Sequence, residues 1–199
     1  MTIRIYVEGG FEGSTKTNCR KAFSTFLAKV VRPGSFKVIA SGSRAQAFQD
    51  FCSALRQHPA DYNVLLVDSE TAVTTRSWQH LREREGDNWP RPHGADDDQV
   101  HLMVQVMEAW FLADPDALST YYKQGFLRNS LPRRKNIEMI DKKAVFESLS
   151  HASKDTQKGT YHKTRHGFDL LELIDPGLVQ AASSHAADLF SVLLKKATP

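Results

Sequence analysis

Acidic side chains follow several apolar runs of the sequence, close to the points where these runs end. Glu8 follows the first run, Asp68 and Glu70 follow the third, and Glu108 lies just past the fourth, with Asp114 six residues later. Carboxylates gathered in one place repel each other unless a cation neutralises them, and Mg²⁺ or Mn²⁺ prefers such hard oxygen ligands. Glu8, Asp68 and Glu70 therefore predict a divalent-metal site. Each acid taken singly also fits a loop residue or a helix cap.

The elements that would position these acids alternate between strands and helices. Apolar runs predict strands, and apolar residues at helical spacing predict helices. This alternation favours a three-layer α/β sandwich with a mainly parallel sheet, in which sites form outside the carboxyl ends of the strands. The acids stand at that edge. Strands are expected at residues 3–7, 36–40, 63–67 and 101–106, with helices at 17–31, 44–57 and 78–84.

The chain changes character after residue 115, where strand signals end. Its 199 residues make about one large domain. We therefore expect an α/β body over residues 1–115 and a helical C-terminal part over 116–199, which together form one compact domain. Within the C-terminal part, helices are expected at residues 116–124, 141–150, 167–174 and 183–196.

Charge is distributed unevenly along the chain, although the net charge is only +3. Residues 1–118 carry 13 Lys and Arg against 15 Asp and Glu, whereas residues 119–168 carry 11 against 4. Residues 169–199 carry 2 against 4. A basic segment that follows an acidic-leaning body is typical of proteins that bind a polyanion such as nucleic acid. It is also typical of a solvated helical surface.

Basic residues interleaved with an aromatic side chain lie within this segment. Such a pattern can bind a phosphate backbone while the ring stacks on a base. Lys163 or His166 could also contact the scissile phosphate, where a cation stabilises charge and a histidine exchanges protons near neutral pH. A solvated loop has the same composition, so both interpretations stay open. The expected nucleic-acid contacts are Lys154, Lys158, Tyr161, His162, Lys163, Arg165, Arg133, Arg134 and Lys135.

A near match to the phosphate loop G-x-x-x-x-G-K-[ST] begins directly after the first acid. Gly10, Gly13, Lys16 and Thr17 would carry it, and the strand that ends before the later acids could be its partner. Thr15 occupies the position at which the motif requires a glycine for close backbone approach to phosphate. A nucleoside-triphosphate-binding protein is therefore an alternative interpretation.

Several motifs together resemble known families. Glu8 after the first strand, with Asp68 and Glu70 after a later one, resembles the Toprim arrangement, in which a glutamate follows strand one and paired acids follow strand three. The wider sequence is closer still to a Toprim-like bacterial family, domain of unknown function 4276. The stretches that carry this resemblance are EGG at 8–10, CR at 19–20, LVDSE at 66–70, HLMVQ at 101–105, MEAWFLAD at 107–114, YHK at 161–163, HG at 166–167 and IDP at 174–176.

The resemblance implies both a metal and a chemistry. Toprim domains occur in topoisomerases, primases and nucleases of the overcoming-lysogenisation-defect type, where they bind Mg²⁺ for phosphodiester chemistry. By this resemblance Glu8, Asp68 and Glu70 hold the metal, and Glu108 and Asp114 are candidates for a second ion. Glu70 replaces the usual second aspartate and reaches one methylene further. Some relatives are encoded beside ABC-type ATPases in phage-defence modules, which implies an ATPase partner.

Cysteine count and hydropathy exclude several other classes. Cys19 and Cys52 are too few for a disulfide framework or a thiolate zinc site. No apolar run approaches the roughly 20 residues of a membrane span, and the N-terminus does not read as a signal peptide, so we expect a cytoplasmic protein. The acids, the basic segment and the chemistry that the resemblance implies together predict a Mg²⁺-dependent nuclease or nuclease-like effector. A non-catalytic Toprim-like partner subunit of an ATPase and a nucleotide-binding protein are the alternatives.

Overall fold

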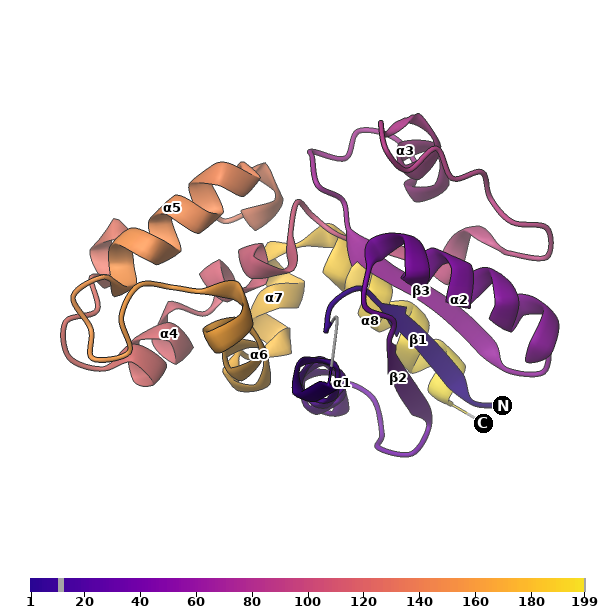
Figure 1. Ribbon diagram of the computed structural model, residues 1–199, viewed down its shortest axis with the longest axis horizontal. Coiled ribbons are helices and arrows are strands. Elements are labelled where there is room, and N and C mark those ends of the chain that lie inside the picture. Colours follow the sequence, from indigo (N-terminus) through magenta and orange to yellow (C-terminus); the bar gives the residue numbers. More distant parts are fainter. Residues whose placement is uncertain (11–12, 199) are drawn as a thin grey trace.

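The protein contains a four-stranded parallel sheet, which lies in the right-hand half of Figure 1. The computed structural model describes residues 1–10 and 13–198. All strands run in the same direction, so the residues that follow β1 and β3 meet at the carboxyl edge of the sheet. The strands, in the spatial order β2-β1-β3-β4, are β1 (Ile3–Val7), β2 (Phe36–Ala40), β3 (Tyr62–Asp68) and β4 (Val100–Met103).

Helices cover both faces of the sheet because both faces carry apolar side chains. Ile5 and Leu66 point into a core shared with α1 (Gly13–Ala28) and α8 (Ser184–Ala197). Tyr6 and Leu65, each one position along its strand, point into a second core with α2 (Arg44–Gln57) and α3 (Ser77–Glu83). This alternation is the two-residue period of a strand buried on both sides. The expected α/β fold with a parallel sheet between helices is confirmed.

The helical C-terminal part is also confirmed, with one helix that the sequence analysis missed. This helix, α7, begins at Pro176, where the missing N–H of proline costs nothing because the first N–H groups of a helix have no partner within it. Asp175 caps that helix by accepting a hydrogen bond from the Gly177 N–H at 2.7 Å. The helices of this part are α4 (Pro115–Tyr122), α5 (Lys142–Ser153), α6 (Lys163–Leu173), α7 (Pro176–Ala182) and α8.

Two segments differ from their expected conformations at places that matter for the site. The fourth strand ends at Met103, and residues 107–113 form a 3₁₀ helix, η2 (Met107–Ala113), that leads away from the sheet edge.

At the other end of the chain, α8 returns to the sheet and packs against β4 and β1 (Figure 1). The C-terminal helices and the α/β body therefore share one hydrophobic core. In the described part of the chain, no helix is long and apolar enough to cross a membrane.

A buried carboxylate joins this C-terminal helix to the preceding segment. Glu138, in the short helix η4 (Ile137–Met139), accepts hydrogen bonds from the Ser183 hydroxyl at 2.6 Å and from the His185 N–H at 2.9 Å. Its second oxygen lies 3.0 Å from Nδ1 of His185. Burial alone would raise the pKa of Glu138, but these hydrogen bonds outweigh it and lower the pKa to about 2.

Glu138→Gln is expected to lower the free energy of unfolding by about 2 kcal/mol at pH 7, because hydrogen bonds to a charged acceptor are lost. The unfolded chain protonates this group near its ordinary pKa of 4.5, whereas the folded protein keeps it ionised down to about pH 2. The stabilisation is therefore complete above pH 4.5 and disappears as the pH falls toward 2. Urea unfolding of both proteins between pH 7 and pH 3 measures this. A stability difference that stays constant over that range would contradict it.

Candidate metal centre

Three carboxylates converge at the carboxyl edge of the sheet. Glu8 follows β1, Asp68 ends β3, and Glu70 lies two residues further, and one oxygen of each lies within 4.8 Å of the others. Asp68 is buried, and Glu8 and Glu70 are partly buried. The sequence prediction that these three side chains come together is confirmed. We call this set the acidic triad; its oxygen ligands could hold a metal ion.

Backbone amides hold one oxygen of two of these carboxylates in place. The Met107 N–H at the start of η2 donates to Oδ1 of Asp68 at 2.7 Å. The Asp68 N–H in turn donates to Oε1 of Glu8 at 2.9 Å. The second oxygen of each carboxylate makes contact only with side-chain cations among the described residues. The positions of Glu8 and Asp68 are therefore set by the fold before any ligand binds.

Glu70 adopts a backbone conformation that is uncommon for a residue with a side chain. Its φ is 68°, in the left-handed region that favours glycine. The Glu70 N–H donates to the carbonyl oxygen of Gln105 at 2.7 Å, which holds the turn. Lys142, the first residue of α5, forms an ion pair with Oε2 of Glu70, and its N–H donates to the Gln105 side chain at 3.1 Å. Strain of this kind is concentrated at functional sites.

An arginine that the sequence analysis did not single out orients Glu8. Arg44 begins α2, and its Nη1 lies 3.5 Å from Oε2 of Glu8. The same guanidinium binds Asp87 through two hydrogen bonds of 2.8 Å and also donates to the carbonyl oxygen of Asp68. The sequence carried one signal for this residue, since Arg44 follows β2 at the same sheet edge as the acids. No pattern in the sequence pointed to Asp87, which lies in the irregular segment after α3.

Lys163 connects the acidic triad to a fully buried glutamate. Its Nζ lies 3.8 Å from Oδ2 of Asp68 and 3.7 Å from Oε1 of Glu108. The Tyr161 hydroxyl donates to the same Oε1 of Glu108 at 3.0 Å. Oε2 of Glu108 has no hydrogen-bond partner among the described residues. Lys163 therefore lies between Asp68 and Glu108, and Glu108 does not join the acidic triad as a ligand of the expected second ion.

The electrostatics of the site follow from this burial. Burial raises the pKa of Asp68 well above its ordinary value, and the charges of Glu8 and Glu108 add to that effect while Lys163 opposes it. Burial would lower the pKa of Lys163, but Glu108 and Asp68 outweigh it, so the ammonium group stays charged. Ionisation of Asp68 is therefore unfavourable without a further cation, and a divalent ion would supply one.

A pocket of about 210 Å³ opens onto the triad. Its wall includes Gly9 and Gly42, which pair across the ends of β1 and β2 through an N–H···O hydrogen bond of 2.7 Å. Gly9 has a φ of 120°, and a Cβ there would lie 3.2 Å from Sγ of Cys19. Only glycine fits this position easily. Arg44 and Lys163 also line the pocket, so a ligand at the triad would meet both cations.

Asp114, expected as a ligand of a second ion, has a structural role instead. Its Oδ1 accepts a hydrogen bond from the Ala117 N–H at 3.0 Å and so caps α4. Its Oδ2 accepts from the Asp175 N–H at 2.9 Å, which joins α4 to the start of α7. Both oxygens are occupied and the residue lies outside the acidic triad, because η2 separates it from the sheet edge.

His166, expected near the scissile phosphate, and Tyr161, expected to stack on a base, are both buried. His166 is buried, and its Nδ1 lies 3.1 Å from the Tyr122 hydroxyl and accepts from the His162 N–H at 3.2 Å. Burial lowers its pKa. Tyr161 is 7% exposed and its ring packs against Phe111, so the ring has no face free to stack on a base. The aromatic position in the basic pattern belongs to the core.

The remaining basic residues of that pattern are exposed. Lys158 places its Nζ 4.2 Å from the centre of the Tyr121 ring. Lys154, His162 and Arg165 lie on the surface. Among the described basic residues that were predicted to bind nucleic acid, Lys163 is the one that forms ion pairs with Asp68 and Glu108. Arg133, Arg134 and Lys135 line a different pocket.

The described residues of the near-phosphate loop lie outside the acidic triad. Phe11 and Glu12 of this segment lie outside the described residues. A Cβ at Gly10 would lie 2.5 Å from Cα of Lys16, so the chain runs directly against the first turn of α1, which begins at Gly13. Gly13, Lys16 and Thr17 line a separate depression beside β2. The nucleotide-binding alternative therefore stays a prediction, and Gly13, Lys16 and Thr17 line a different pocket from the triad.

Fold and site define an α/β protein with an acidic triad at the carboxyl edge of a parallel sheet, covered by helices of its own C-terminal part. The chain belongs to the family described as Domain of unknown function (DUF4276), which it matches over residues 7–194. That range includes the triad, Glu108 and Lys163. No curated protein and no solved structure matches the chain significantly.

Proposed function

We propose that this protein is a Mg²⁺- or Mn²⁺-dependent nuclease that hydrolyses phosphodiester bonds in DNA or RNA. The observation that carries the proposal is the acidic triad, with ligand-type oxygens of Glu8, Asp68 and Glu70 within 4.8 Å of one another beside the ammonium group of Lys163. The resemblance of these acids to the metal-binding residues of Toprim domains supports the same chemistry.

Glu8, Asp68 and Glu70 would hold the metal, and the bound ion would activate water and stabilise the charge that develops on the phosphorus oxygens. Lys163 lies at the rim of the pocket, where its ammonium group can bind a non-bridging phosphate oxygen and stabilise the same charge. Glu108 and Tyr161 keep Lys163 in position from the buried side. Arg44 orients Glu8 and, being bound to Asp87, does not move with the substrate.

The partners of this activity are part of the proposal. A nucleic acid is the substrate, and the resemblance supports an ABC-type ATPase as a second subunit that controls the nuclease in a cytoplasmic defence module. The alternative of a non-catalytic subunit makes the opposite prediction for cleavage, because such a subunit needs no metal at the triad.

The direct test incubates wild-type protein with single-stranded DNA, duplex DNA and transfer RNA in Mg²⁺, in Mn²⁺ and in EDTA. Cleavage of at least one substrate is expected with metal and none in EDTA. Glu8→Gln keeps the oxygen that accepts the Asp68 N–H but removes the charge, so it should lose cleavage and bind Mn²⁺ at least about tenfold more weakly.

Asp155→Asn is the matched control, because Asp155 is an exposed carboxylate outside the triad. It should cleave and bind metal as the wild type does. If wild-type protein leaves every substrate intact with either metal, alone and together with a co-encoded ATPase, the nuclease proposal fails and the non-catalytic alternative gains support.

A further inference from the structure

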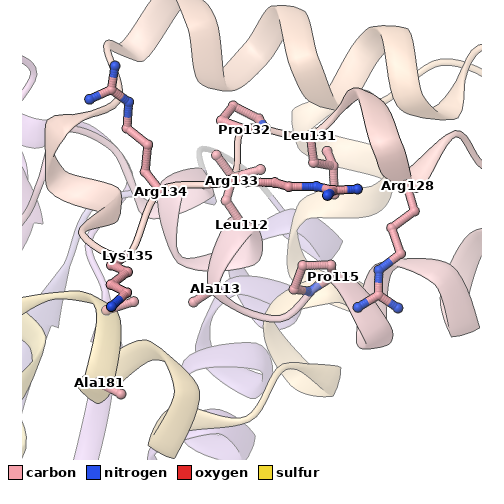
Figure 2. Close-up of a pocket in the computed structure, with 11 residues that line it drawn as sticks. Leu112, Ala113, Pro115, Arg128, Leu131, Pro132, Arg133, Arg134, Lys135 and Ala181 are labelled. Carbon is pink, nitrogen blue, oxygen red and sulfur yellow. The ribbon is translucent and has the colours of Figure 1, made fainter.

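A second pocket, of about 650 Å³, is lined in part by Leu112 and Ala113, at the far end of η2 from the acidic triad. Figure 2 shows the residues that line this pocket. Four cationic side chains line it, and no acidic side chain of the described residues does. Its floor is apolar and includes Leu112 and Pro115. We call it the cationic pocket. Its four cations are Arg128, Arg133, Arg134 and Lys135.

The backbone that carries these cations is anchored on both sides. Leu131 and Ile137 are buried on either side of the three consecutive cations 133–135. The Leu127 N–H donates to the carbonyl oxygen of Ala152 on α5 at 2.8 Å, which ties the start of the segment to the helical part. In Figure 2, Arg133 extends toward Arg128, and Lys135 extends toward Ala181. The charges therefore project from a positioned segment.

Most of this positive charge has no counterion within the protein. Arg128 forms an ion pair with Asp116, and Arg133 binds the neutral side-chain oxygen of Asn129 at 2.8 Å. Among the described residues, Arg133, Arg134 and Lys135 form no ion pair. Like charges on neighbouring residues repel each other, and a concave surface with charges of one sign concentrates their field. An anionic ligand would relieve this repulsion.

We propose that the cationic pocket binds the phosphate backbone of the nucleic-acid strand that the acidic triad cleaves. This inference rests on the proposed function. Guanidinium groups bind phosphate oxygens in pairs with matching geometry, and the apolar floor suits the sugar and base faces of a nucleotide.

The connection between the two pockets favours a strand over a small phosphorylated ligand. The Met107 N–H at one end of η2 holds Asp68, while Leu112 and Ala113 at its other end line the cationic pocket. A 3₁₀ helix rises about 2 Å per residue, so the two ends of η2 lie roughly 10–12 Å apart. Residues 107–112 of η2 are buried, so a strand that reaches both sites runs over the surface around this helix. At a rise of about 3.4 Å per nucleotide, the straight distance alone corresponds to about three nucleotides of a helical strand. One substrate strand is long enough to occupy both sites.

The test measures binding of a fluorescein-labelled single-stranded DNA of twelve nucleotides in EDTA, where cleavage is off, over a series of salt concentrations. Replacing Arg133, Arg134 and Lys135 together by Gln should weaken binding at least about tenfold at 100 mM salt. Each lost phosphate contact on a single strand removes about 0.7 from the slope of log affinity against log salt, so the slope should fall by about 2. A structural role alone would not change this slope.

Joint replacement of Arg32, Lys37 and Arg56 by Gln is the matched control. These exposed cations lie near the opposite, amino-terminal edge of the sheet, and their loss changes the net charge equally. The control should retain most of the slope. Equal slopes for both triple variants, or no binding by the wild type, would overturn the inference. It is also overturned if a mononucleotide competes as well as the twelve-nucleotide strand.

Failure of this inference can be told from failure of the proposed function. If the wild type cleaves with metal and the pocket variant still binds the strand normally, only the inference about the cationic pocket is rejected. If binding depends on the pocket but no cleavage occurs in Mg²⁺ or Mn²⁺, the nuclease proposal is rejected and the nucleic-acid site is kept.

Discussion

Asp68→Asn is expected to lower metal-dependent cleavage at least about a thousandfold, which corresponds to about 4 kcal/mol of lost transition-state stabilisation. Asp68 is the most buried member of the triad. One of its oxygens accepts a hydrogen bond from the Met107 N–H, and the other faces Lys163. Replacement by asparagine keeps Oδ1 as an acceptor for the Met107 N–H. The start of η2 should therefore stay in place while the charge that attracts the metal is lost.

The stability of Asp68→Asn separates this chemistry from a folding defect. Ionisation of Asp68 is unfavourable in the metal-free fold, as its raised pKa shows, so removing the charge should leave the melting temperature unchanged or higher in EDTA. Mg²⁺ should then raise the melting temperature of the wild type but not that of the variant. Thermal unfolding with and without Mg²⁺, run beside Asp155→Asn, measures both effects. Cleavage within tenfold of wild type would exclude Asp68 as a metal ligand.

Lys163→Met is expected to lower the turnover rate about a hundredfold or more without weakening divalent-metal binding, because the cation that contacts the scissile phosphate is lost while the ligands remain. Metal binding should stay the same or become tighter, since Lys163 lies 3.8 Å from an oxygen of Asp68 and competes for that charge. Single-turnover cleavage and Mn²⁺ titration, made on the same preparation, separate the two quantities.

The same substitution should destabilise the metal-free protein. Without Lys163, the fully buried carboxylate of Glu108 loses the cation beside it, and removing one partner of a buried pair costs about 3–5 kcal/mol. The lysine side chain is 61% exposed, so we expect about 2 kcal/mol, or roughly 4–8 °C in melting temperature.

Mg²⁺ should recover most of the stability lost in Lys163→Met, because it restores positive charge at the triad. Lys163→Arg keeps the charge and is the control for both properties; it should keep the metal-free stability and part of the cleavage rate. A fully active Lys163→Met, or one that no longer binds Mn²⁺, would rule out this role for Lys163.

The acidic triad could be predicted from the sequence because it depends on a local rule. Continuous apolar runs mark strands buried on both faces, and parallel strands bring the residues that follow them to one edge. Glu8 and Asp68 needed no further information. Glu108 and Asp114 follow the same pattern in the sequence, but the chain turns into η2 after β4. This turn buries Glu108 behind Lys163 and carries Asp114 away from the edge.

The basic segment shows where such local reasoning stops. Composition marked residues 119–168 as positive, but it did not separate Lys163, which reaches the acids, from Tyr161 and His166, which are buried in the helical part. Lys163 and His166 lie in the first turn of α6 and point in different directions, and Tyr161 lies just before that helix. Their roles depend on the packing of α6 against η2 and α4, which no local pattern specifies.

The sequence by itself therefore determined the order of strands and helices, the parallel sheet and the three carboxylates at its edge, because periodicity and strand direction are properties of short segments. The tertiary structure alone decided which charges surround those carboxylates. Arg44, Lys142 and Lys163 come from helices far apart in the chain and meet the acids only when those helices pack. The cationic pocket likewise forms only where separate segments meet, so its volume and its missing counterions are properties of the folded molecule.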